Sequence, residues 1–151
     1  MSQVKLNRLH KFAAVLSLAL IAQFASMASW ASDFAAHKVV IQVSTKDPLV
    51  QKIALNNAVN LQKHYGPDNI KVEVVAYGPG LSLLTKKSSQ KDRIKSLAVQ
   101  DITFSACSNT MRKVKKKTGK NPALVEGVGV VPAGVARILE LQEKGYSYVR
   151  P

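Results

Sequence analysis

The sequence predicts an α/β protein, a three-layer α/β/α sandwich around a five-stranded, mostly parallel sheet. Strand-like and helix-like segments alternate along the chain from residue 37 onward, and this alternation is typical of a parallel sheet with helices on both faces. The first strand is almost continuously apolar, as expected for a strand that is covered on both sides. The chain has no internal repeat and no long linker, which favours one folded domain.

The predicted strands are stretches rich in β-branched and aromatic residues that lie between turn signals. They span residues 37–44, 69–77, 101–107, 127–132 and 146–151. Helical spacing and capping residues predict helices at 48–65, 90–100, 109–117 and 133–144, with a short helical turn at 81–84. The apolar residues expected on the helix at 133–144 are Val135, Ile138, Leu139 and Leu141.

The helix at 48–65 has clear start and stop signals. Asp47 is a good N-cap, Pro48 suits the first helical position, and Gly66-Pro67 ends the helix. Spacings of three and four place one apolar face along Val50, Ile53, Ala54, Asn57, Ala58 and Leu61. Asn57 is the polar exception. It either satisfies a neighbouring backbone group or faces a crevice near Cys107.

The first 31 residues have the three-part pattern of a secretory signal peptide. Three basic residues precede an apolar run at 12–28, which ends in small residues. Cleavage after Ala31 is expected, and cleavage after Ala28 is the alternative. A retained membrane anchor is a third possibility, although the run is short for the roughly 20 residues that span a bilayer. We therefore predict a signal peptide at 1–31 and an exported, periplasmic domain at 32–151.

The chain is strongly basic, with 22 Lys and Arg against 9 Asp and Glu, a net charge of +13. Removal of the three cations in residues 1–31 lowers this to +10. Such a charge inside a cell favours nucleic acid as a partner, but export argues against it. The remaining partners are a membrane surface, an acidic protein or small anions, and the alternative is a lysine-rich solvated surface.

Cys107 is the only cysteine in the chain, so it cannot form an internal disulfide. It lies where a predicted strand gives way to a predicted helix, an edge at which ligands bind in open α/β sheets. Ser108 or Asn109 is the expected N-cap of that helix, and the amides of Ser108, Asn109 and Thr110 are expected to point at the sulfur. A helix start and nearby cations favour the reactive thiolate. The alternative is a buried structural cysteine.

Two glycine-rich stretches are candidate anion sites. Gly78-Pro79-Gly80 follows a strand, where a turn can bring its backbone close to an anion, and a plain tight turn is the alternative. Gly127, Gly129 and Gly134 resemble a nucleotide motif, but the first two lie before or within a strand rather than after it. We therefore discard that motif.

Metal and hydrolase chemistry are weakly supported. His37, His64 and Cys107 lack the close spacing of metal ligands. Ser105 and Ser108 do not lie in a Gly-x-Ser-x-Gly elbow. We predict no metal and no cofactor, and thiol chemistry is what remains.

Several stretches together resemble the DsrE/DsrF-like family. They are Ala-Leu-Asn-Asn-Ala at 54–58, Val-Val-Ala-Tyr-Gly-Pro-Gly at 74–80, Phe-Ser-Ala-Cys-Ser-Asn-Thr-Met at 104–111, Val-Val-Pro-Ala-Gly-Val at 130–135 and Gly-Tyr-Ser-Tyr-Val-Arg-Pro at 145–151. The resemblance implies the α/β sandwich and a homotrimer or homohexamer. It also implies carriage of sulfane sulfur as a persulfide on Cys107. The family's sulfur-relay members work in the cytoplasm, whereas this chain has the pattern of an exported protein.

These observations predict an exported DsrE-like protein that binds or transfers sulfane sulfur through Cys107, in exchange with a sulfur donor or acceptor protein. Asn109 and Thr110 are expected to shape the helix start, Gly78 and Gly80 to bring a loop to the same crevice, and Asn57 to contribute to it. The alternative is a non-catalytic binding or assembly subunit, whose basic face docks an acidic partner or a membrane.

Overall fold

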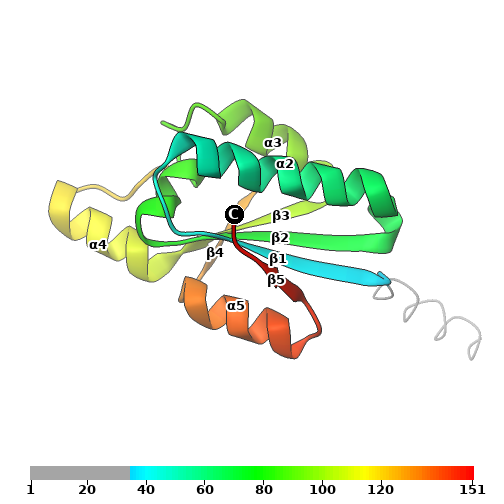
Figure 1. Cartoon of the computed structure of the whole chain (residues 1–151). Coiled ribbons are helices and arrows are strands. Elements are labelled where there is room, and N and C mark those ends of the chain that lie inside the picture. The colour runs from blue at the N-terminus through cyan, green and yellow to red at the C-terminus, as the bar shows by residue number, and fades with distance from the viewer. Residues whose placement is uncertain (1–34) are drawn as a thin grey trace, which may run out of the picture. The chain divides into compact units, whose positions relative to one another are not determined.

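Strands and helices alternate from His37 to Val149 in the computed structural model, which describes residues 35–151 (Figure 1). The strands are β1 (His37–Val43), β2 (Ile70–Ala76), β3 (Ile102–Cys107), β4 (Val128–Val131) and β5 (Ser147–Val149). The helices are α2 (Pro48–Tyr65), α3 (Lys91–Ala98), α4 (Ser108–Thr118) and α5 (Gly134–Glu143), and the 3-10 helices are η2 (Pro67–Asn69) and η3 (Gly78–Leu84). The predicted signal peptide lies outside the described residues.

The five strands form one sheet in the order β4-β3-β2-β1-β5, and every neighbouring pair is parallel. The register pairs Ala76 with Ala106, and Cys107 with Val131. The carboxyl ends of β2, β3 and β4 therefore lie side by side at one edge of the sheet. The predicted fold class, an α/β/α sandwich with a five-stranded parallel sheet, is confirmed.

One face of the sheet is covered by α2, α3 and η3, and it holds the larger apolar core (Figure 1). Ile41, Val74 and Phe104 from the three central strands are fully buried there, against Leu55 of α2 and Ile94 of α3. The strand residues on this face alternate with those on the opposite face, as the pleat requires.

The opposite face is covered by α5, and its apolar cluster is small. Ile138 and Leu141 of α5 pack against Val40 and Val75. The buried polar residues of the strands, which are Gln42, Glu73 and Ser105, all lie on this face by the same alternation. This face therefore combines a short apolar contact with buried polar side chains.

Two predicted helix faces are wrong in detail. On α2 the buried residues are Gln51, Ala54, Leu55 and Ala58, whereas Ile53 is 37% exposed. The face is rotated because Gln51 turns inward, where its amide donates to the Thr45 carbonyl and the Ser82 hydroxyl, both at 2.9 Å. On α5, Val135 and Leu139 are exposed, because only Gly134, Ile138 and Leu141 are buried on that helix.

Among residues 35–151, no helix is both long enough and apolar enough to cross a membrane.

Candidate functional site

Cys107 is the last residue of β3 and the N-cap of α4. The helix begins at Ser108, so the cysteine itself takes the capping position that we predicted for Ser108 or Asn109. Its backbone is extended, with φ −75° and ψ 116°, as is usual for an N-cap. In that position a side chain lies next to the free amides of the first helical turn. The sulfur of Cys107 thus lies where a capping oxygen is usually found, but it makes no capping hydrogen bond.

Segments from three strands meet at this thiol. The Asn109 amide donates to the Pro132 carbonyl at 3.3 Å, which joins the start of α4 to the turn after β4. The Gly78 amide donates to the Thr110 hydroxyl at 2.9 Å, which joins the start of α4 to the turn after β2. The site is therefore built where β2, β3 and β4 end.

The surroundings of Cys107 act on its pKa in opposite directions. Burial raises the pKa of the thiol, whereas the Thr110 hydroxyl and the amides of Gly134, Thr110 and Asn109 lower it. The lowering contacts prevail, and the pKa lies below its ordinary value of 9.0. The thiol makes no full capping hydrogen bond to the first turn, so the amides act as nearby dipoles that favour the negative charge.

Thr110 connects the thiol to the turn after β2. Its hydroxyl oxygen accepts the hydrogen bond from the Gly78 amide, and a hydroxyl has only one proton to donate. The same hydroxyl lies near the Cys107 sulfur and lowers the pKa of the thiol. The position of Gly78 and the charge on the sulfur are thus linked through one side chain.

The structure places the predicted site residues in three different settings. Gly78, Asn109 and Thr110 lie around Cys107. Gly80 is buried in η3, the turn after β2, where a Cβ would lie 2.1 Å from the Val43 carbonyl oxygen. Asn57 is half-buried on α2, which packs on the sheet face opposite to the side chain of Cys107 by strand alternation.

Gly134 is a site residue that the sequence analysis missed. Its amide approaches the sulfur from the start of α5, and a Cβ there would lie 2.9 Å from the Tyr77 ring. Cys107 therefore lies near the first residues of two helices, α4 and α5. The available signal was the strand-turn-helix pattern at 128–134, because parallel strands end at the same edge.

A buried ion pair holds α5 over the sheet beside the thiol. The Arg137 guanidinium donates to both Glu73 carboxylate oxygens at 2.9 and 2.7 Å, and the Ser105 hydroxyl donates to the same carboxylate at 2.6 Å. Glu73 is only 3% exposed, and its hydrogen bond is the main cause that raises the pKa of Arg137. Ser105 and Cys107 lie on the same face of β3, so this network lies next to the site.

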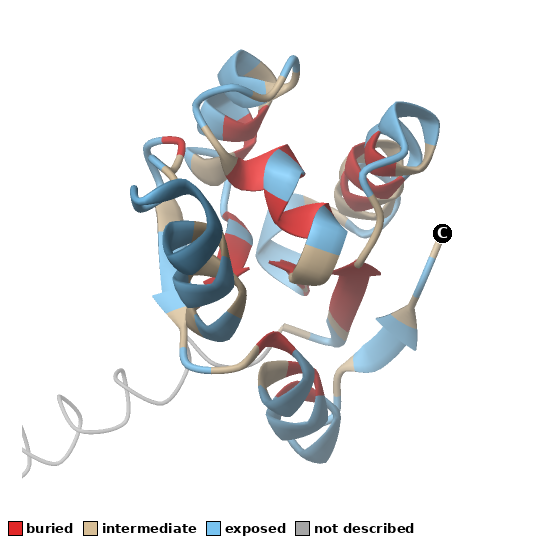
Figure 2. Ribbon diagram, turned by 90° about the vertical axis from the view of Figure 1, so that its left-hand side faces the viewer, coloured by how far each residue is buried: buried red, intermediate tan, exposed pale blue. Residues whose placement is uncertain are grey.

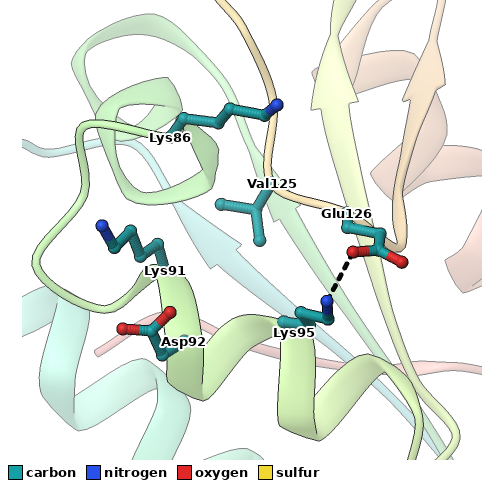
Figure 3. Close-up of a pocket in the computed structure, with 6 residues that line it drawn as sticks. All are labelled: Lys86, Lys91, Asp92, Lys95, Val125 and Glu126. Atoms are coloured by element: carbon teal, nitrogen blue, oxygen red, sulfur yellow. Dashed lines mark ion pairs between the residues drawn. The ribbon is translucent and has the colours of Figure 1, made fainter.

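A shallow pocket of about 290 Å³ lies elsewhere, between α3 and the segment before β4 (Figure 3). It is lined by Lys86, Lys91, Asp92, Lys95, Val125 and Glu126. Figure 3 shows Lys95 paired with Glu126 at 2.6 Å and the other two ammonium groups pointing away from each other. None of these residues belongs to the cysteine site. Within residues 35–151, no three His, Cys, Asp or Glu side chains are grouped as a metal site requires.

Comparison with known proteins agrees with this fold. The family model of the DsrE/DsrF-like family matches residues 17–151. The chain belongs to the DsrE/DsrF-like family. A solved structure of the same fold is that of a protein of unknown function, MTH1491, from Methanobacterium thermoautotrophicum, with 32% identity and a TM-score of 0.69. The match covers 76% of this chain and 99% of that one. A comparison with curated proteins found no match.

Membership of the DsrE/DsrF-like family places the chain in a family of the sulfur-relay type. This agrees with a candidate site at which the surroundings lower the pKa of a thiol.

Proposed function

We propose that this protein carries sulfane sulfur as a persulfide on Cys107 and passes it to an acceptor thiol. The observation that supports this most strongly is the position of the only cysteine at the N-cap of α4, within reach of three amides and the Thr110 hydroxyl. These groups favour a negative charge on sulfur. Both the thiolate and the persulfide formed from it carry such a charge.

The proposed transfer needs no oxidant or reductant. The Cys107 thiolate attacks the outer sulfur of a donor persulfide, R–S–SH. The donor S–S bond breaks, R–S⁻ leaves as a thiolate, and Cys107 becomes Cys107–S–SH. An acceptor thiolate then attacks the outer sulfur of that persulfide and regenerates the Cys107 thiolate. The amides of Asn109, Thr110 and Gly134 stabilise the charged sulfur before and after each step.

Burial fits a carrier better than a general nucleophile. Cys107 is only 4% exposed, so large reagents reach its sulfur poorly. A persulfide places the transferable sulfur about 2 Å beyond Sγ, which is the length of one S–S bond. The same burial supports the second candidate, a binding subunit whose cysteine is structural.

The cellular setting is also part of the proposal. The basic start, apolar run and small residues within 1–31 support export and removal of that segment. Exposed Val135 and Leu139 on α5, together with the small size of the domain, support assembly into a homotrimer or homohexamer. The donor and acceptor are proposed to be proteins in the same compartment.

Intact mass spectrometry after incubation with a persulfide or polysulfide donor tests the proposal. We expect one added sulfur atom, its removal by an acceptor thiol, and no addition in Cys107→Ser. The assignment is direct because the chain has a single cysteine. If the folded native protein stays unmodified while the urea-unfolded chain gains sulfur, Cys107 is structural and the binding-subunit function replaces this one.

A further inference from the structure

Helix α4 carries a dense set of cations that no acidic side chain neutralises. The cations are Arg112, Lys113, Lys115, Lys116 and Lys117, with Lys120 just beyond the helix, and all are exposed. No Asp or Glu occurs between Asp101 and Glu126. Lys95 and Arg137 form ion pairs elsewhere in residues 35–151, and none of these pairs involves α4.

This arrangement is costly for an isolated helix. Arg112 and Lys116, like Lys113 and Lys117, are four residues apart, where like charges repel across one helical turn. Lys115, Lys116 and Lys117 lie in the last turn of α4, where the helix dipole favours positive charge. The dipole supplies only about half a negative charge there, so it does not balance three ammonium groups. A partner that supplies negative charge offsets the repulsion.

The basic surface begins at the thiol. Cys107 is the N-cap of α4, and Arg112 reaches back along the first turn to donate to the Ser108 hydroxyl at 3.2 Å and to the Asn109 side chain. Lys115–Lys117 lie roughly 12–15 Å from Cys107 along the helix axis, at 1.5 Å per residue. Figure 1 shows α4 projecting at one end of the described domain, and Figure 2 looks onto that end and shows no buried segment on α4.

The apolar residues of α4 identify the kind of partner. Met111 and Val114 are half-buried and pack against the larger core. Helices that lie in a membrane surface need an apolar face to insert among the acyl chains, and α4 has already used its apolar residues inside the protein. An acidic protein surface requires only complementary charge, so it fits α4 better than a membrane does.

We propose that α4 is the docking surface for an acidic protein that exchanges sulfur with Cys107. This inference rests on the proposed function, because it names the class of the donor or acceptor. A partner with an acidic surface beside its own sulfur is drawn along α4 towards the start of the helix, where the thiol lies. Attraction of this kind raises the rate of encounter and weakens as salt screens the charges.

Two cysteine peptides serve as probes, one flanked by Asp and Glu and one by Ser and Gly. Each carries its cysteine as a mixed disulfide with 2-thiopyridine, so attack by Cys107 releases 2-thiopyridone, which is measured by absorbance. We expect the acidic peptide to react about tenfold faster at low salt. The faster reaction of the acidic peptide disappears at about 0.5 M NaCl, where the Debye screening length is only roughly 4 Å.

Two matched variants locate the effect. In K115Q/K116Q/K117Q the advantage of the acidic peptide is lost, whereas in K52Q/K63Q/K144Q, which removes the same charge from other exposed positions, it is kept. Neutral iodoacetamide reacts at the same rate with all three proteins. Equal loss in both variants means that net charge alone acts, and it overturns the assignment to α4.

Fluorescence anisotropy separates this inference from the proposed function. It uses labelled peptides in which Ser replaces the cysteine, so that binding is measured without thiol chemistry. Binding of the acidic peptide that depends on α4, in a protein that gains no sulfur from a persulfide donor, keeps the docking surface and refutes sulfur transfer. Exchange with no preference for the acidic peptide refutes the docking surface alone. Binding to phosphatidylglycerol vesicles through α4, without binding of the acidic peptide, overturns the protein partner in favour of a membrane.

Discussion

On one face of the sheet, α2 and α3 bury a large and mostly apolar core, whereas on the other face α5 covers a small apolar cluster beside the buried carboxylate of Glu73. Cys107 lies on the second face, next to Ser105 along β3. The larger core stabilises the domain through apolar area. The polar face fixes positions, because the Arg137–Glu73 pair holds α5 where the Gly134 amide reaches the thiol.

The largest expected effect on stability comes from truncating Phe104, a large and fully buried side chain of the apolar face. Phe104 is fully buried, so Phe104→Ala is expected to reduce the free energy of unfolding by about 3–5 kcal/mol. Urea denaturation measures this loss. The control Val99→Ala, at a residue 81% exposed, is expected to change it by less than about 0.5 kcal/mol. Equal effects of the two changes contradict the assigned core.

The next effect comes from breaking the ion pair on the polar face. Arg137→Met leaves the Glu73 carboxylate buried without its cation, and we expect a loss of about 2–4 kcal/mol, since the arginine is 27% exposed and partly screened. Adding Glu73→Leu should restore part of the stability, because no buried charge then remains. If the pair only stabilises, the pH dependence of Cys107 alkylation is unchanged. If it positions α5, alkylation shifts to higher pH in both variants.

A smaller effect on stability, but a direct one on the thiol, is expected for Thr110→Val. Loss of the hydroxyl raises the pKa of Cys107 towards its ordinary value of 9.0, so the midpoint of the alkylation rate against pH moves upward. The pKa of Cys107 is lower in the folded protein than in the unfolded chain, where it is about 9.0. The thiolate therefore contributes its full stabilisation above pH 9.0, and this contribution is lost as the pH falls through the folded pKa. The variant therefore loses stability at all pH values, because the Gly78 amide loses its acceptor, and it loses more at high pH, where the lowered pKa of Cys107 contributes. Thr110→Ser keeps the hydroxyl and should keep the native midpoint.

The smallest effect is expected for an ion pair outside both faces. Lys95 and Glu126 lie 2.6 Å apart, but their side chains are 57% and 75% exposed. Exposed pairs contribute little because water screens them and the side chains lose freedom. Lys95→Ala should leave the urea midpoint almost unchanged, with or without added salt. A loss as large as that of Arg137→Met would mean that burial does not explain the difference between the two pairs.

The succession of strands and helices along the chain, and with it the fold class, follows from local signals. Asp47 and Pro48 mark the start of α2, and the side chain of Asp47 does accept the Leu49 amide, at 2.8 Å. Gly119 ends α4 in the left-handed conformation, as glycine commonly does. Such signals depend on neighbours within a few residues, so a single sequence reveals them.

Inward and outward helix faces were harder to predict. Gln51 is buried and Ile53 is exposed on α2, because the Thr45 carbonyl and the Ser82 hydroxyl satisfy the glutamine amide. Ser82 is 31 residues away from Gln51 in the chain. A helical pattern contains no information about such a distant partner, so hydrophobicity alone misplaced the face.

The cysteine site was predicted only in part for the same reason. A strand followed by a helix start is a local pattern, and it placed Cys107, Asn109 and Thr110 together. The approach of Gly134 depends on the packing of α5 over the sheet, to which both the apolar contacts of α5 and the hydrogen bonds of Arg137 to Glu73, 64 residues away in the chain, contribute.

The sequence by itself determined the parallel α/β fold, the family and the single thiol at the start of a helix, because each is specified by residues close together in the chain. The tertiary structure alone decided which groups surround that thiol. Thr110 meets Gly78 across 32 residues, and Gly134 meets Cys107 from a different helix. Such contacts exist only after parallel strands align their carboxyl ends, since that alignment brings distant turns to one edge.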